Sequence, residues 1–355
     1  MKIFDFLIQQ NKLNRSWTET ETKNYGIMND EELKKLNLTL RPSKGIKTGK
    51  VGCFLFGQSG DLMEAMGVLK YIDVLFPNKE IVWFANFPNA DALRYSNVSE
   101  VRRWPWAGYH LPDGCPDYDK ILCNSENKLD LEKAKDFPDT ADLEDGYFPA
   151  PHMVAAEKRE GVEYSNVSKQ VFGVPMDWEW HPYLSWDDKE REDIHNFINT
   201  LPSSRKIILF ETFGGSGQSS IDDDMIKRTI QACREKLGMC NIIFVSHKYL
   251  RQNESYPEGF FNNEGIFSAS QFTPRQCALL NKKADLMICI SSGISVSTSC
   301  WGNKPVPKLQ FCGSRICSTG AIANGEFHLV ECNADSMDVV KSRFFEKLNE
   351  LLSKI

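Results

Sequence analysis

The chain has 355 residues, of which 41% are hydrophobic and 25% charged, and its formal net charge is −6. This composition indicates an ordinary globular protein, and the length favours two domains over one. The acidic balance argues against a broad nucleic-acid-binding surface. No stretch approaches 18 consecutive apolar residues, so no transmembrane helix is expected. The eleven cysteines have irregular spacings and no C-x-x-C pair, which favours reduced core thiols over disulfides or a structural zinc site.

Residues 1–48 are polar and weakly periodic, and we interpret them as an N-terminal extension packed on the first domain. Their short apolar patch is broken by Asp5 and Gln9 and lacks a small-residue cleavage site, so a secretory signal is not expected. The sequence therefore predicts a cytoplasmic location. Peripheral membrane contact through this patch stays open as an alternative.

The first α/β domain is predicted over residues 49–180. Its first strand is followed by the tight loop Gly57-Gln-Ser-Gly60, after which Asp61 opens a helix. The Pro-, Gly- and Asp-rich stretch 104–149 is expected to form functional loops or an acceptor surface. The expected elements are strands near 50–56, 80–85 and 119–123 and helices near 61–76 and 151–160.

The second domain is predicted over residues 181–335, after a Pro-bounded linker at 174–183. A strand at 206–211 leads into a Gly/Ser loop, then a helix at 222–237 and a strand at 241–246. Backbone N–H groups of such a loop can hold a phosphate, although Gly-rich loops are also common as plain turns. The candidate donor-binding residues in this loop are Thr212, Gly214, Gly215, Ser216, Gly217 and Gln218.

The stretch from Gln271 to Leu309 carries the strongest pattern in the chain. Thr273 and Pro274 are expected to start a helix, 285–290 is an apolar strand, and a new helix follows the polar loop after it. An anion held at that loop would lie at the carboxyl end of a strand, where open α/β sheets bind ligands. The alternative is a simple hydroxyl turn and helix cap. The candidates here are Ser291, Ser292, Gly293 and Ser295.

Two further side chains end strands at the same predicted edge. His247 follows the strand at 241–246. It is a candidate contact to the base or sugar of the donor, and the alternative is an ordinary surface histidine. Glu211 ends its strand and could touch the donor. A last strand is expected at 327–331, and residues 336–355 are predicted to form a C-terminal helix that returns to the first domain. Together these elements predict two Rossmann-like domains facing one cleft.

The order of these motifs resembles glycosyltransferase family nine, the family of the ADP-heptose:lipopolysaccharide heptosyltransferases. The resemblance rests on Phe56-Gly-Gln-Ser-Gly-Asp61 and Phe76-Pro-Asn-Lys-Glu-Ile-Val-Trp83 in the first half. In the second half it rests on Ala284-Asp285, Ser291-Ser292-Gly293 and Gly302-Asn-Lys-Pro-Val306. It implies a GT-B fold and transfer of a sugar from a nucleotide-diphosphate sugar to a hydroxyl of a glycan or lipopolysaccharide-type acceptor, with inversion.

By this resemblance Asp61 falls on the carboxylate proposed as the family's catalytic base. The alternative is that Asp61 only caps its helix, and Glu64, one turn further on, is the rival carboxylate. The chain departs from the family pattern at two positions. Ser291 stands where the family has Asp, and Val296 stands where it has His.

No metal or other cofactor is expected, because no Asp-x-Asp sits in a strand-end loop and the acidic run 222–224 opens a helix instead. The expected partners are a nucleotide-sugar donor and a glycan or lipid-linked glycan acceptor, and nucleic acid is not expected. Two alternatives share the scaffold: a hydrolysing nucleotide-sugar epimerase-like enzyme, and a non-catalytic nucleotide-sugar-binding subunit.

Overall fold

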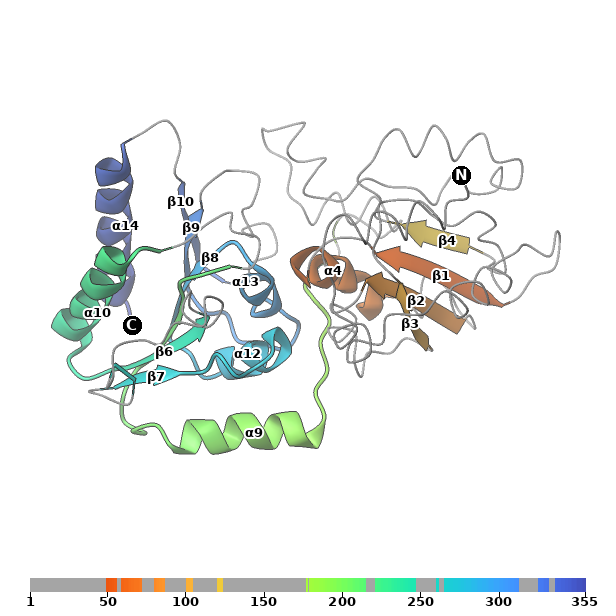
Figure 1. Ribbon diagram of the computed structural model, residues 1–355, viewed down its shortest axis with the longest axis horizontal. Coiled ribbons are helices and arrows are strands. Elements are labelled where there is room, and N and C mark those ends of the chain that lie inside the picture. Colours follow the sequence, from red (N-terminus) through yellow and green to blue (C-terminus); the bar gives the residue numbers. More distant parts are fainter. Residues whose placement is uncertain are drawn as a thin grey trace, which may run out of the picture. The chain divides into compact units, whose positions relative to one another are not determined.

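The computed structural model of the protein (Figure 1) divides into two compact units, Met1–Trp180 and His181–Ile355. Each unit carries its own parallel sheet. The N-terminal extension and the helix predicted near 151–160 lie outside the described residues. The described ranges are 49–55, 59–71, 80–86, 100–104, 120–123, 177, 179–214, 221–246, 260–261, 265–312, 325–331 and 336–355.

The first unit contains a four-stranded parallel sheet in the order β3-β2-β1-β4. Its strands are β1 (Lys50–Leu55), β2 (Glu80–Asn86), β3 (Glu100–Trp104) and β4 (Lys120–Cys123). The chain runs outward from β1 to β3 and then returns to β4 on the other side of β1. The strand order therefore reverses between β1 and β4. The sequence patterns predicted three of these strands and missed β3, whose EVRRW sequence has little apolar character.

The helix after β1 begins two residues before its predicted start, and its predicted end at residue 76 lies outside the described residues. It consists of α4 (Ser59–Ala65) followed by a 3-10 segment, η1 (Met66–Lys70). A Cβ atom at Gly67 would lie 2.5 Å from the Trp180 indole, so only glycine lets this ring pack against the segment. The Trp180 Nε1–H also donates to the Glu64 carbonyl oxygen at 2.8 Å. Trp180 is therefore anchored in the first unit.

The second unit contains a six-stranded, fully parallel sheet in the order β10-β9-β8-β5-β6-β7. The chain runs outward from β5 through β6 to β7 and then returns to β8 beside β5. The strand order reverses between β5 and β8, which pair directly. The strands are β5 (Ile207–Glu211), β6 (Asn241–Ser246), β7 (Ile266–Ser268), β8 (Leu286–Ile290), β9 (Lys308–Cys312) and β10 (Phe327–Glu331).

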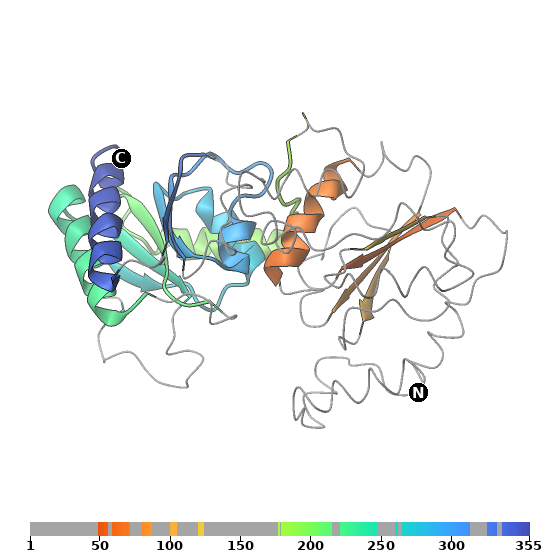
Figure 2. The ribbon, with the colours of Figure 1, turned by 90° about the horizontal axis from the view of Figure 1, so that it is seen from above.

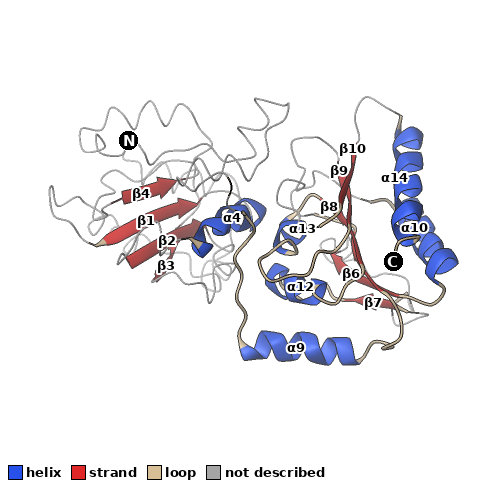
Figure 3. Cartoon of the chain, turned by 180° about the vertical axis from the view of Figure 1, so that it is seen from behind, coloured by secondary structure: helices blue, strands red, loops and turns tan. Residues whose placement is uncertain are grey.

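Helices cover both faces of this sheet (Figure 3). One face carries α9 (Asp188–Asn199), α12 (Pro274–Asn281) and α13 (Gly293–Ser297), and the other carries α10 (Asp223–Leu237) and α14 (Met337–Leu352). Because side chains alternate along a strand, Leu209 and Met287 enter the core under α9 and α12, whereas Ile208 and Ile288 enter the core under α10 and α14. This two-sided burial explains the continuous apolar runs in the sequence.

The C-terminal helix requires a correction. We predicted that it returns to the first domain, but α14 lies beside α10 on the second sheet (Figure 2). Val340, Phe344, Leu348 and Leu351 are completely buried in that core. These residues form one apolar stripe at helical spacing, and the whole stripe packs against the face of the second sheet. Among the described residues, no helix is both long and apolar enough to span a membrane.

Candidate functional site

The two loops predicted to bind the donor meet at the carboxyl edge of the second sheet. Thr212–Gly214 follows β5 and Ser291–Gly293 follows β8, and these strands flank the point where the strand order reverses. A Cβ atom at Gly214 would lie 2.9 Å from the Ile290 Cδ1 atom and 3.4 Å from the Ser291 carbonyl oxygen. The backbone at Gly214 therefore lies close against the loop that follows β8. Gly215, Ser216, Gly217, Gln218 and His247 lie outside the described residues.

The first of these loops is tied to the neighbouring strand. Thr212 is buried, and both its N–H and its Oγ1–H donate to the Ser246 carbonyl oxygen at 3.1 Å. The Ser246 hydroxyl in turn donates to the Phe213 carbonyl oxygen at 2.6 Å. The backbone that leads into the Gly/Ser loop is thus fixed on β6 before the loop begins.

The second loop forms a complete capping box at the start of α13. The Ser292 Oγ accepts from the N–H groups of Ile294 and Ser295, at 3.0 and 3.1 Å. The Ser295 hydroxyl accepts from the Ser292 N–H at 3.1 Å and donates to the Ser292 carbonyl oxygen at 2.8 Å. The cap that the sequence left as the alternative is therefore present. Ser291, Ser292 and Gly293 are half-buried, whereas Ser295 is completely buried inside the cap.

A buried carboxyl group, Glu211, lies directly beneath this cap. Its side chain is 1% exposed, and its Oε1 accepts the Ser292 hydroxyl proton at 2.5 Å. Burial raises the pKa of Glu211 to about 8, against the opposing effects of the Ser292 and Ile290 hydrogen bonds and the charge of Lys308. Glu211 is consequently a mostly neutral carboxylic acid at pH 7.

Lys308 extends this arrangement under α13. Its Nζ donates to the Ser295 carbonyl oxygen at 3.0 Å and to the Ser299 Oγ at 2.5 Å, and burial lowers its pKa to about 8. We call Glu211, Ser292, Ser295, Ser299 and Lys308 the α13 polar cluster. Lysine at the start of β9 carries no sequence signal for such a role, because exposed lysines also begin strands.

The candidate base lies in the first unit, in the helix that follows β1. Asp61 is the third residue of α4, which begins at Ser59. It therefore lies inside the first turn and not at the N-cap position that the alternative reading gave it. The Asp61 side chain is outside what the structure describes. Glu64, one turn further on, is buried, with 6% of its surface exposed.

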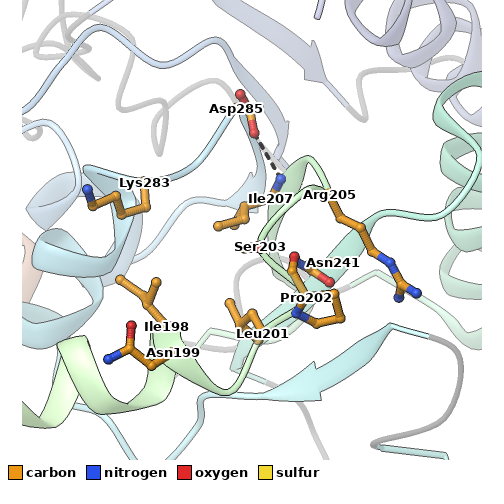
Figure 4. Close-up of a pocket in the computed structure, with 10 residues that line it drawn as sticks. All are labelled: Ile198, Asn199, Leu201, Pro202, Ser203, Arg205, Ile207, Asn241, Lys283 and Asp285. Atoms are coloured by element: carbon orange, nitrogen blue, oxygen red, sulfur yellow. Dashed lines mark hydrogen bonds between the residues drawn. The ribbon is translucent and has the colours of Figure 1, made fainter.

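A separate cavity of about 370 Å³ lies at the opposite, amino-terminal edge of the second sheet. Figure 4 shows Asn241, Lys283 and Asp285 around it, with the Asp285 Oδ2 accepting from the Ile207 N–H at 2.9 Å. Open α/β sheets bind ligands at the carboxyl ends of their strands, so this cavity is not part of the candidate site.

Three possible metal ligands, Glu326, His328 and Glu350, come together within the described part of the chain. The Lys354 Nζ already contacts the two glutamates, at 2.7 and 3.0 Å. The group sits on the surface at the amino end of β10, away from the donor loops. The expectation that the reaction needs no metal stays a prediction.

The sequence matches no family model, and a search of curated proteins gave no match. The fold, in contrast, has clear relatives. A family 9 glycosyl transferase from Veillonella parvula superposes with a TM-score of 0.61 at 12% identity, covering 88% of this chain and 99% of that one. The ADP-heptose lipopolysaccharide heptosyltransferase II of E. coli gives 0.58 at 14% identity, over 86% and 99% of the two chains.

A third structure, the E. coli heptosyltransferase WaaC with ADP, gives a TM-score of 0.51 at 11% identity, over 86% of this chain and all of that one. Identities this low establish a shared fold. The superpositions therefore confirm the resemblance at the level of the fold. This chain has an α/β fold of the GT-B type, similar to that of the family-nine glycosyltransferases.

Proposed function

We propose that this protein is a glycosyltransferase that moves a sugar from a nucleotide-diphosphate sugar to a hydroxyl of a glycan or lipid-linked glycan acceptor. The observation that carries the proposal is the meeting of Thr212–Gly214 and Ser291–Gly293 where the strand order of the second sheet reverses. Such a point is where open α/β sheets bind nucleotides. The fold shared with glycosyltransferases supports the same reading.

The proposed reaction is inverting and independent of metal. Asp61 takes the proton of the acceptor hydroxyl while the nucleotide diphosphate leaves from the opposite face of the sugar. Asp61 suits this role because α4 follows the carboxyl end of β1, beside the point where the first sheet reverses its order. Glu64 is the alternative base. Backbone N–H groups and hydroxyls of the two donor loops hold the diphosphate in place of a metal ion.

Two alternatives remain distinct from this proposal. A hydrolysing epimerase would release free nucleotide and an epimerised sugar without any acceptor. A non-catalytic subunit would bind the nucleotide sugar and turn over nothing. The sequence features that favour the non-catalytic alternative are Ser291 and Val296, which replace the Asp and His of the family pattern. Membrane contact through the N-terminal extension stays a prediction, since that segment lies outside the described residues.

A thermal-shift panel tests the proposal. Sugars linked to ADP, UDP and GDP are added to the whole protein, with a CMP-linked sugar, which carries a single phosphate, for comparison. A ligand at 100 times its dissociation constant adds about 2.7 kcal/mol of stability. We expect one clear hit that persists in Asp61→Asn, whereas transfer to an acceptor is lost in that variant. Absence of any shift would overturn the proposal, and a shift with turnover retained in Asp61→Asn would move the base to Glu64.

A further inference from the structure

The hydrogen bonds around Ser292 fix the direction of its hydroxyl proton. Its Oγ accepts from the N–H groups of Ile294 and Ser295, which occupy both lone pairs of the oxygen. The proton must therefore be donated, and it goes to the Glu211 Oε1. It follows that Oε1 acts only as an acceptor. When Glu211 carries a proton, that proton resides on Oε2.

Glu211 is also placed to influence both donor loops. It is the last residue of β5, immediately before Thr212–Gly214, and its side chain reaches across to the loop after β8. One buried side chain thus connects the two loops at the point where they meet.

We propose that Glu211 is a positioning residue for the nucleotide-sugar donor, acting through Ser292 on the geometry of the Ser291–Gly293 loop. This inference rests on the proposed function, because it concerns the same site. Glu211 touches no reacting atom in this role. Its function is to keep the Ser292 hydroxyl turned away from the ligand and the capping box closed, so that the loop presents one fixed backbone.

The protonation state of Glu211 sets the charge beneath the loop. Burial raises the pKa of its carboxyl to about 8, so the group is mostly neutral at pH 7 and ionises above pH 8. The titratable groups that face it are Lys308 from β9, Cys289 from β8 and Cys277 from α12, whereas α13 contributes only hydroxyls. An ionised Glu211 would repel the diphosphate of a donor, so affinity should fall as the pH rises through 8.

Three variants separate positioning from a merely structural role. Glu211→Gln keeps an acceptor for the Ser292 hydroxyl and places a donor at the second position, which imitates the protonated acid. Glu211→Met fills the same volume but removes the acceptor. Ser297→Ala is the matched control, because it removes a buried hydroxyl from the same helix whose bonds run to Pro274 and Ile294, away from the Glu211 carboxyl.

The test is calorimetric titration of the whole protein between pH 6.5 and 9 with ADP-glucose, UDP-glucose or GDP-mannose, whichever gives the largest thermal shift with the wild type. Wild-type affinity should fall up to about tenfold per pH unit above pH 8, the limit for a single ionisation that abolishes binding. Glu211→Gln should bind within about threefold of wild type at pH 7 and lose most of the fall in affinity above pH 8. Glu211→Met should bind at least tenfold more weakly at pH 7, and Ser297→Ala should follow the wild-type curve.

The inference is overturned if Glu211→Met binds like wild type, or if Glu211→Gln reproduces the full wild-type pH profile. Either result with a binding wild-type protein leaves the proposed function intact. A wild-type protein that binds none of the three probes overturns the proposed function, and the role of Glu211 fails with it.

Discussion

The buried ion pair between Arg275 and Glu190 offers the sharpest test of what holds the second unit together. Arg275 is 1% exposed and joins α12 to α9 through two bonds to the Glu190 carboxylate, at 3.1 and 2.8 Å. It also donates to the Ser185 carbonyl oxygen, in the segment that enters α9. Replacing Arg275 by Met keeps much of its volume and leaves the Glu190 carboxylate buried without its partner.

The expected loss of stability in Arg275→Met is large because the variant leaves a buried carboxylate without its cationic partner. Removing one member of a buried pair costs about 3–5 kcal/mol, whereas replacing both members by apolar residues is often neutral. The helix α9 supplies its own control in Lys189 and Asp193, a pair 3.6 Å apart whose side chains are 81% and 39% exposed. Breaking an exposed pair of this spacing costs only about 0.3–0.5 kcal/mol.

Hydrogen exchange of the α9 and α12 backbone amides measures the difference locally, without assuming that the two units unfold together. In Arg275→Met these amides should exchange roughly 10²- to 4 × 10³-fold faster than in wild type, since each 1.4 kcal/mol is a factor of ten. Lys189→Gln, which breaks the same exposed pair from its other side, should change the rates by less than about threefold. The double variant Arg275→Met, Glu190→Leu should recover most of the loss. Equal effects of Arg275→Met and Lys189→Gln would refute the reasoning.

Three further predictions address the rest of the molecule. Gly67→Ala should destabilise the first unit by about 1–3 kcal/mol, seen as a lower urea midpoint, because the added methyl would overlap the Trp180 indole. Asp61→Asn should lower kcat by at least about 10²-fold and leave donor affinity unchanged, measured by transfer kinetics and calorimetry. The raised pKa of Glu211 contributes stability that is present below pH 4.5 and is lost as the pH rises through 8, so Glu211→Gln should flatten that decline in thermal unfolding scans.

The sequence predicted the alternation of strands and helices because buried parallel strands have a strong signature. β5, β6 and β8 each contain a run of four or five apolar residues, and each strand was expected within one residue of its observed bounds. The missed helix α9 shows the opposite case. Its start does carry a signal, since Asp187 and Glu190 form a capping box, but its sequence DKEREDIHNFIN is mostly charged and buries only Glu190 and Ile194.

The candidate site also has one part that could be predicted from the sequence and one part that could not. Strand-end loops could be located from the sequence, because a parallel sheet brings the carboxyl ends of its strands to one edge. The α13 polar cluster could not be assembled, because it depends on which strands are neighbours. Glu211 and Ser292 are 81 positions apart and meet only because β8 returns to pair with β5. Nothing in the local pattern around Lys308 distinguishes a buried lysine from an exposed one.

The α13 polar cluster also suggests a physical reason why serine can stand at position 291, where the family pattern has Asp. In the pattern that this chain resembles, an acidic residue occupies that position, at the tip of the loop after the strand. Here the loop has a hydroxyl at that position, and the neighbouring strand β5 supplies an acid, Glu211, which is buried beneath Ser292. Position 291 is only half-buried, so an acid there would ionise more readily than Glu211, which burial holds mostly neutral at pH 7. If this loop holds the diphosphate as we propose, the chain carries less negative charge there than the pattern it resembles, while a buried hydrogen bond still fixes the loop.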